Sequence, residues 1–375
     1  MSKAAQAGLT ALAFTVAVVV FAPRFSRLHA GEVPPSGGYR ALAPITRGNL
    51  TIFPVVAATT HDTGMFITLD EGLRAGTVVI TEVGQEQGLR RRPLPYRRPD
   101  GAQVNRLELV NNSERALILL AGEIVSGGKQ DRVVGKDRII PPQSDPVDLS
   151  VFCVEPGRWT AVSQNFGGAG TGRVSASVAL AAPAPMAQPS VRSKAMADKD
   201  QQKVWDSVNE SNRKIATAAG RVNTTSYAEV VGAGKERIDQ VANPVEQSFA
   251  GVLHKLREQK AVGVVVAIGG DVVWADIFAS TPLLEKYWPK LARSYAAESL
   301  TTSVIARQPS QSAAQAFLEQ MAGNKETVES EPGVYRHTEI YGAGYRAFEL
   351  ASLLPKTGFD VHVSKMAEYL GTEKR

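Results

Sequence analysis

Apolar residues in the first half of the chain alternate with polar ones in the manner of β-strands, and short polar connections separate the runs. Thr77–Val83 alternates and is strongly β-branched, which is typical of a strand. Similar runs predict further strands at 49–56, 65–69, 104–110, 116–121 and 147–154. A brief helical turn is expected at 69–73, ending at Gly76.

The second half of the chain changes to helical spacing. Apolar residues recur three and four positions apart, and they predict helices at 196–219, 243–258, 282–300 and 310–321. Gly269 and Gly270 join two strand-like runs, which predicts a hairpin. Pro244 is expected in the first turn of its helix, and Pro289 is expected to kink or restart the next one.

Strand patterns return near the C-terminus, at 334–341, 344–350 and 360–363. Because the helices do not alternate regularly with the strands, the order disfavours a doubly wound parallel sheet. It predicts an α+β fold with mostly antiparallel sheets.

The N-terminus has the pattern of an export signal. Lys3 precedes the uncharged apolar run 11–22, and the small residue Ala30 offers a cleavage point. An uncleaved membrane anchor is the alternative, because Arg24 and Arg27 could flank one. We therefore predict a signal segment at 1–30 and an exported protein, periplasmic or secreted, that contacts a membrane only through that segment.

Composition divides the remainder. Residues 31–48 are rich in proline and glycine and are interpreted as a tether, and 49–365 are predicted to form a single α+β domain. Within it, the Gly/Ala/Pro-rich passage at about 167–195 is predicted to be a flexible insertion.

The charge balance argues against a nucleic-acid partner. The chain has 375 residues and a net charge of +5. Residues 1–30 contribute three basic residues and no acidic ones, so the exported part would carry only about +2. The hydrophobic content of 43% is ordinary for a protein with a packed core.

Cys153 is the only cysteine, so the chain cannot form an internal disulfide. One interpretation is a nucleophilic or redox thiol. The other is a small buried residue at a strand end, which its neighbours Val151, Phe152 and Val154 favour.

Two charged clusters follow the apolar runs 116–121 and 147–154, at 122–132 and 155–159. If both runs are strands, each cluster lies just past a strand end, where a rigid sheet can position ligand-binding groups. The candidate ligand-binding residues are Glu123, Lys129, Gln130, Asp131, Arg132, Glu155, Arg158 and Trp159. The alternative for the first cluster is a solvated hairpin loop.

The first cluster is not a Walker nucleotide loop. An additional glycine precedes Lys129, and Gln130 stands where a metal-binding hydroxyl is required. The glycines still let a ligand approach the backbone. Arg158 could hold a phosphate or carboxylate while Trp159 stacks on a ring, or the indole could simply fill the core.

Glu123 and Glu155 are the candidate catalytic residues if the protein is an enzyme. Facing one another, they could act as acid and base on a glycosidic bond or chelate a hard cation. Alternatively, each pairs with an arginine, Arg132 or Arg158, as a structural bridge.

Metal and triad patterns are absent from the sequence. The five histidines show no ligand spacing and there is no nucleophile elbow, so no metal site is predicted and the cofactor is unknown. Asp276 stands in an apolar run, where it could reach the site or cap the following helix.

Four segments carry a family resemblance: LLAGEIVSGGKQDR, CVEPGRW, VAIGGDVVWADIF and YWPKLARSY. From about Gly48 to Tyr295 they resemble the ARG and Rhodanese-Phosphatase-superfamily-associated protein domain family. The family usually has asparagine where this chain has Asp131, and Pro156 lies within the second motif. The resemblance implies nucleotide-derived or phosphorylated ligands, because the family is associated with ADP-ribosylglycohydrolase and rhodanese-phosphatase domains.

Three hypotheses follow. The first is a non-catalytic domain of the cell envelope that binds a small anionic or nucleotide-derived ligand. The second is a hydrolase that uses Glu123 and Glu155, and the third is a purely structural envelope protein.

Overall fold

The computed structural model describes residues 38–83, 106–155, 165–167, 184–219, 226–227, 230–231, 235–255, 260–303 and 308–368. Several predictions fall outside these ranges: the signal segment 1–30, residues 31–37 of the tether, and the candidate residues Arg158 and Trp159. The tether prediction is wrong for the described residues 38–48, because Tyr39–Ala41 and Ile45–Arg47 are strands that pair with Leu50–Ala57.

A nine-stranded sheet, antiparallel throughout, dominates the structure. Its strands run in the order β1-β3-β13-β14-β18-β17-β16-β15, with β2 paired to β3. Their bounds are β1 Tyr39–Ala41, β2 Ile45–Arg47, β3 Leu50–Ala57, β13 Lys260–Ile268, β14 Asp271–Phe278, β15 Gly323–Glu331, β16 Tyr335–Gly342, β17 Tyr345–Ser352 and β18 Asp360–Ala367.

Two smaller sheets form the other β unit. The six-stranded sheet has the order β12-β8-β9-β11-β6-β5, and the three-stranded sheet has the order β10-β7-β4. Their bounds are β4 Phe66–Thr68, β5 Val78–Glu82, β6 Arg106–Asn111, β7 Ala116–Leu119, β8 Ile124–Gly127, β9 Arg132–Val134, β10 Arg138–Ile140, β11 Val147–Cys153 and β12 Phe166–Gly167. Only the β4–β7 pair is parallel among the described strands.

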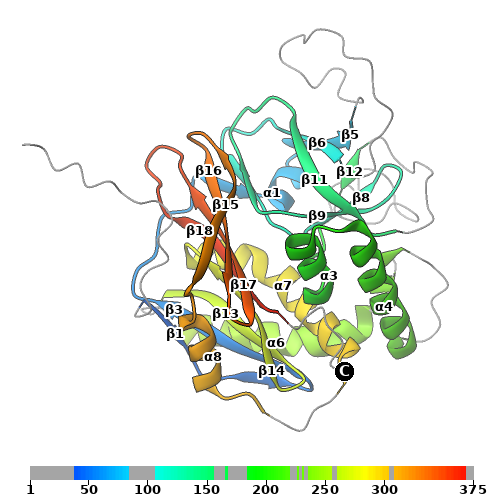
Figure 1. Ribbon diagram of the computed structural model, residues 1–375, viewed down its shortest axis with the longest axis vertical. Coiled ribbons are helices and arrows are strands. Elements are labelled where there is room, and N and C mark those ends of the chain that lie inside the picture. Colours follow the sequence, from blue (N-terminus) through cyan, green and yellow to red (C-terminus); the bar gives the residue numbers. More distant parts are fainter. Residues whose placement is uncertain are drawn as a thin grey trace, which may run out of the picture.

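The helices pack between and beside these sheets. They are α1 Leu69–Arg74, α3 Pro189–Ser193, the π-helix η1 Lys194–Asp198, α4 Gln201–Ala219, α6 Lys235–Lys255, α7 Thr281–Thr301 and α8 Gln311–Glu319. Figure 1 shows the six-stranded sheet at the upper right above α3 and α4, with the nine-stranded sheet running down the left side from β16 to β1 and β14. In the described part of the chain, no helix combines the length and the apolar character needed to span a bilayer.

The predicted α+β class with mostly antiparallel sheets is confirmed. The hairpin is also confirmed, because Gly269 and Gly270 connect β13 to β14 with φ angles of 59° and 88°. A largely apolar face of the nine-stranded sheet packs against α6 and α7, with Trp274, Tyr287 and Tyr295 among the largest buried side chains.

One helix prediction is wrong. α6 begins at Lys235, not at 243, so Pro244 lies inside the helix instead of in its first turn. α7 continues through Pro289 from Thr281 to Thr301, so of the two alternatives given for Pro289 the helix does not restart there. In both helices, packing of the apolar stripe against the core outweighs the local cost of the missing N–H.

The C-terminal part of the predicted insertion is structured. Ala184 donates its N–H to Asp70 Oδ1 at 2.7 Å, and Nε2 of Gln188, the residue before α3, donates to Ser211 Oγ at 2.6 Å. Arg192 in α3 is fully buried. The composition of small residues and prolines predicted a flexible segment. The segment is ordered by tertiary contacts, which local propensity does not reveal.

Gly122 allows Arg192 to reach the interior. Its φ is +94°, and a Cβ at this position would lie 2.6 Å from Cγ and 2.8 Å from Cδ of Arg192. Strain in the backbone and overlap with the arginine therefore both oppose any side chain here.

We predict that Gly122→Ala lowers the free energy of unfolding by about 3 kcal/mol, because it combines a left-handed backbone with overpacking. Gly76→Ala is the control: its φ is +65° but nothing lies within 4 Å of an added Cβ, so it should cost about 1 kcal/mol. Urea unfolding measures both, and equal losses would contradict the role given to Arg192.

Candidate functional site

The loop between β8 and β9 has the geometry of a tight, glycine-dependent turn. Gly127 and Gly128 have φ angles of 140° and 50°. A Cβ on Gly128 would lie 2.3 Å from Phe166 Cζ and 2.7 Å from Glu82 Oε1. The second glycine is therefore needed both for its backbone conformation and for the close approach of its neighbours.

Three carboxylates accept hydrogen bonds from this loop. The N–H of Gly127 donates to Asp131 Oδ1 at 3.1 Å, and the N–H of Lys129 donates to Glu82 Oε1 at 3.0 Å. The N–H of Asp131 donates to Glu155 Oε2 at 3.4 Å. The loop and the segment after β11 therefore lie in contact, and we call Glu82, Gly127–Arg132 and Glu155 the loop cluster.

The loop cluster is buried, unlike a solvated hairpin loop. Gln130 and Asp131 are 5% and 4% exposed, and Arg132 is fully buried. The guanidinium of Arg132 donates from Nη1 to the carbonyl of Gln130 at 2.7 Å, and its Nη2 lies 3.9 Å from Glu82 Oε1. Such burial of a cation requires nearby acceptors and anions, which this cluster supplies.

Glu82 was missed by the sequence analysis. It ends β5 with only 3% of its surface exposed. The available signal was an acidic residue at an inward position of the alternating run 77–83, a pattern that also fits an ordinary strand end.

Cys153 supports the buried-residue interpretation. Its backbone N–H and carbonyl are both bound by the side chain of Gln201, each at 2.9 Å. Burial raises the pKa of its thiol to about 11, although Arg132 acts to lower it. At neutral pH the thiol is therefore protonated and a poor nucleophile.

Glu123 takes part in a different set of contacts. It is fully buried, and its Oε2 accepts the N–H of Leu120 at 2.7 Å. Its Oε1 lies 2.6 Å from Nζ of Lys290, which also lies 2.7 Å from Asp70 Oδ2. Although burial acts to lower it, these two carboxylates raise the pKa of Lys290, so the lysine is charged.

The two candidate catalytic carboxylates thus have separate partners. Glu155 binds the loop cluster, whereas Glu123 binds α7 through Lys290. Among the described contacts, the charged partner of Glu123 is Lys290 and not an arginine. The use of Glu123 and Glu155 as an acid–base pair stays a prediction.

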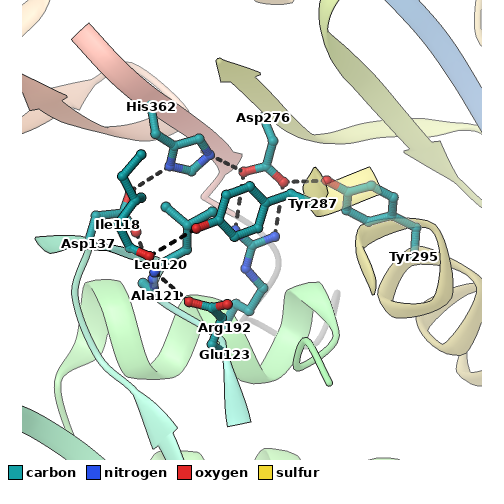
Figure 2. A network of polar contacts seen from close by, with 10 residues as sticks. All are labelled: Ile118, Leu120, Ala121, Glu123, Asp137, Arg192, Asp276, Tyr287, Tyr295 and His362. Carbon is teal, nitrogen blue, oxygen red and sulfur yellow. Dashed lines mark hydrogen bonds and ion pairs between the residues drawn. The ribbon is translucent and has the colours of Figure 1, made fainter. Parts of the chain in front are cut away.

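Asp276 stands at the centre of a second buried network, drawn in Figure 2. Arg192 binds it in a bidentate manner, with distances of 3.0 and 3.1 Å. The hydroxyl of Tyr295 also donates to Asp276, and Nε2 of His362 lies 3.2 Å from its Oδ1. Asp276 does not cap the following helix, because Ser280 does so by accepting the N–H of Leu283 at 3.2 Å.

The network continues through His362 into the smaller β unit. Nδ1 of His362 lies 2.5 Å from Asp137 Oδ2, and the N–H of Ala121 donates to Asp137 Oδ1 at 2.7 Å. We call Asp137, Arg192, Asp276, Tyr295 and His362 the central network. Figure 2 shows its members together, although they come from the β9–β10 turn, α3, β14, α7 and β18, which are far apart in the sequence.

Charges in the central network balance. Burial opposes the charged form of His362, but Asp137 and Asp276 raise its pKa to about 9. Burial likewise disfavours an ionised Asp276, yet Arg192 and His362 hold the pKa of that carboxyl far below its usual range. Two anions therefore face two cations in a region closed to solvent.

The described residues contain no group of three or more His, Cys, Asp or Glu side chains that could hold a metal ion.

The family model of the ARG and Rhodanese-Phosphatase-superfamily-associated Protein domain matches residues 38–366. The chain belongs to this family. No curated protein and no solved structure matches the chain significantly. The family match spans the loop cluster and the central network alike, from Glu82 to His362.

We predict that this family member loses stability at alkaline pH through His362. Its pKa is raised from 6.5 to about 9, so the contribution is complete below pH 6.5 and is lost as the pH rises through 9. The difference corresponds to a loss on the order of 3 kcal/mol.

Urea unfolding at pH 7 and pH 10 should show that loss in the wild type and in His61→Gln, which changes a histidine outside the network. His362→Gln should be less stable at pH 7 and should lack most of the alkaline loss. The same pH dependence in His362→Gln as in the wild type would refute the assignment.

Proposed function

We propose that the protein is a non-catalytic binding domain that takes a small phosphorylated, nucleotide-derived ligand at the loop cluster. The single observation that carries the proposal is the row of backbone amides at Gly127, Lys129 and Asp131, each directed at a carboxylate oxygen. Amides arranged in this way bind oxyanions in general.

The protein's own carboxylates accept hydrogen bonds from these amides. A phosphate that replaced Asp131 or Glu155 would gain the same donors, and Lys129 and Arg132 would lie beside it to offset its charge. When one of these acidic side chains moves out of the loop cluster, the remaining groups are more positively charged and attract a phosphate more strongly.

The buried carboxylate of Glu82 supports a ligand that also carries hydroxyl groups. Within the part of the chain that the structure describes, its Oε2 has no hydrogen-bond donor, and neither Thr81 Oγ1 nor Ser126 Oγ has a partner. A sugar hydroxyl would satisfy such groups, whose burial is otherwise costly. Phosphate and hydroxyl recognition together favour a nucleotide-derived ligand.

No observation favours the hydrolase hypothesis over binding. Glu123 is bound to Lys290 and to a backbone amide, so neither of its oxygens is directed at the loop cluster. We therefore propose no catalytic role for it.

A thermal-shift series with inorganic phosphate, ribose 5-phosphate, AMP and ADP-ribose tests the proposal. At least one phosphorylated sugar should raise the melting temperature by a few degrees at saturation, since ligands that bind the native state stabilise it. Lys129→Ala should abolish the shift in melting temperature. Glu82→Gln should weaken the binding of sugar-containing ligands more than the binding of inorganic phosphate.

Lys286→Ala is the control, because this lysine is also partly exposed and pairs with Glu71 away from the cluster. The proposal fails if none of the four compounds shifts the melting temperature, or if Lys129→Ala and Lys286→Ala respond alike.

We also propose that the protein acts outside the cytoplasm, on the strength of the segment 1–30. Cell fractionation should find it in the periplasm or the medium, or bound to the membrane if the segment is retained. Deletion of residues 4–22 should leave it in the cytoplasm. A full-length wild type found in the cytoplasm would contradict export.

A further inference from the structure

β12 connects the two ends of the six-stranded sheet. Its residues Phe166 and Gly167 pair with β8. On its other side, Asn165 forms an isolated antiparallel bridge with Thr81 of β5. Because β8 and β5 stand at opposite ends of the order β8-β9-β11-β6-β5, these contacts close the sheet into a small barrel. Figure 1 shows β12 between β5 and β8.

The interior of this barrel is apolar along most of its length. Side chains along a strand point alternately to its two faces, so every second residue of each strand points inward. The inward set packs as part of one apolar cluster, which includes Val78, Ile80, Leu107, Leu109, Val125, Val134, Leu149, Val151 and Phe166. Over these positions the barrel is a packed core and not a pore.

A polar layer ends the barrel at the loop cluster. The same alternation places Glu82, Arg132 and Cys153 at the next inward positions of β5, β9 and β11. Glu82 is 3% exposed, and Arg132 and Cys153 are fully buried. Nη2 of Arg132 lies 3.9 Å from Glu82 Oε1, and Cys153 is the strand partner of Arg132. The proposed ligand site therefore lies inside one end of the barrel.

The ring of Phe166 covers this end. It is fully buried, and its Cζ lies 2.3 Å from the point that a Cβ on Gly128 would occupy. Glu82 Oε1 lies 2.7 Å from the same point, so the ring and the carboxylate meet at the loop. A ligand that contacts Glu82 and the loop amides has to take space that this ring now fills.

Other elements cover the remaining wall of the barrel. α3 and α4 pack apolar side chains against the outward residues of β8 and β9. α1 and the three-stranded sheet pack against the interior cluster. β12, by contrast, has two residues, and its described pairing with β5 is the single bridge at Thr81. The boundary between β5 and β12 is therefore the weakest part of the wall in the described chain.

We propose that the barrel opens between β5 and β12, that Phe166 is the side chain that leaves, and that this opening is the entrance to the loop cluster. As an entrance for a ligand it rests on the proposed function, whereas the opening itself is a property of the fold. Phe166 then controls how fast a ligand enters and leaves, as the residues of a lid do.

Cys153 reports the opening, because it is the only cysteine and lies buried in the polar layer. Labelling of the purified protein with N-ethylmaleimide is followed by mass spectrometry over a series of urea concentrations. Local opening exposes little surface, so we expect a labelling rate that hardly depends on urea while urea is low. The rate should rise steeply only where global unfolding exposes the thiol.

Phe166→Ala should raise the labelling rate at low urea by about tenfold or more, because opening no longer exposes a large apolar ring. Phe249→Ala is the matched control. Phe249 is also fully buried, but it lies in α6 with its ring 4.2 Å from that of Trp288. It should destabilise the whole fold and speed labelling only where global unfolding dominates.

A disulfide across the boundary tests the same opening in the opposite direction. Thr81 and Asn165 face one another in the bridge, and facing residues of antiparallel strands lie within the range of a disulfide. In the double variant Thr81→Cys, Asn165→Cys, the oxidised form should label Cys153 about tenfold more slowly than the reduced form. This variant decides the question alone if Phe166→Ala does not fold.

The proposal is overturned if labelling of the wild type follows global unfolding at every urea concentration. It is also overturned if the two phenylalanine variants respond alike at low urea, or if the disulfide leaves the labelling rate of Cys153 unchanged. None of these measurements needs a ligand. A thermal-shift series without any response would refute the proposed function and leave the labelling results as they are, whereas a response with unaltered labelling would refute this entrance alone.

Discussion

Asp276 lies in a strand with no access to solvent, where an unpaired carboxylate would cost several kcal/mol, and the fold supplies three partners for it. Arg192 comes from α3, Tyr295 from α7 and His362 from β18. Arg192 and His362 are the charged partners, and removing Arg192 would leave Asp276 without its bidentate cation in the interior. The central network thus fixes the position of α3 against the nine-stranded sheet and, through Asp137, of the smaller β unit against both.

Other features of the chain serve this constraint. Gly122 has no side chain where Arg192 passes, and the ring of Trp274 lies 4.5 Å from the guanidinium. Lys290 adds a second buried connection, since it binds Glu123 and Asp70 from α7. Gly122 and Glu123, near the start of the first family motif, therefore have structural roles: Gly122 leaves room for Arg192, and Glu123 binds Lys290.

The rest of that motif has a different role. Lys129–Arg132 turns away from the central network and joins Glu82 and Glu155 at the end of β5 and after β11. One continuous stretch of sequence therefore contributes both to the interior joint and to the proposed ligand site. β8 and β9 connect the loop at 127–132 to Glu123 and Asp137, so the conformation of the loop depends on the packing of the interior.

The sequence by itself determined the α+β class, most strands, the hairpin at Gly269 and Gly270, and the family. These follow from local periodicity and from motifs, which are written within a few neighbouring residues. It also singled out the loop at 127–132 as a candidate site, and the structure shows that Gln130, Asp131 and Arg132 in it are buried.

Only the tertiary structure decided which charges meet. Asp276 and His362 are 86 positions apart, and Lys290 lies 167 positions from Glu123. No local pattern encodes such pairs, because a buried charge is stabilised by whichever partner the fold brings to it. For the same reason the sequence could not separate Glu123 from Glu155, reveal Glu82, or show that 184–198 is structured: their environments are made by segments distant in the chain.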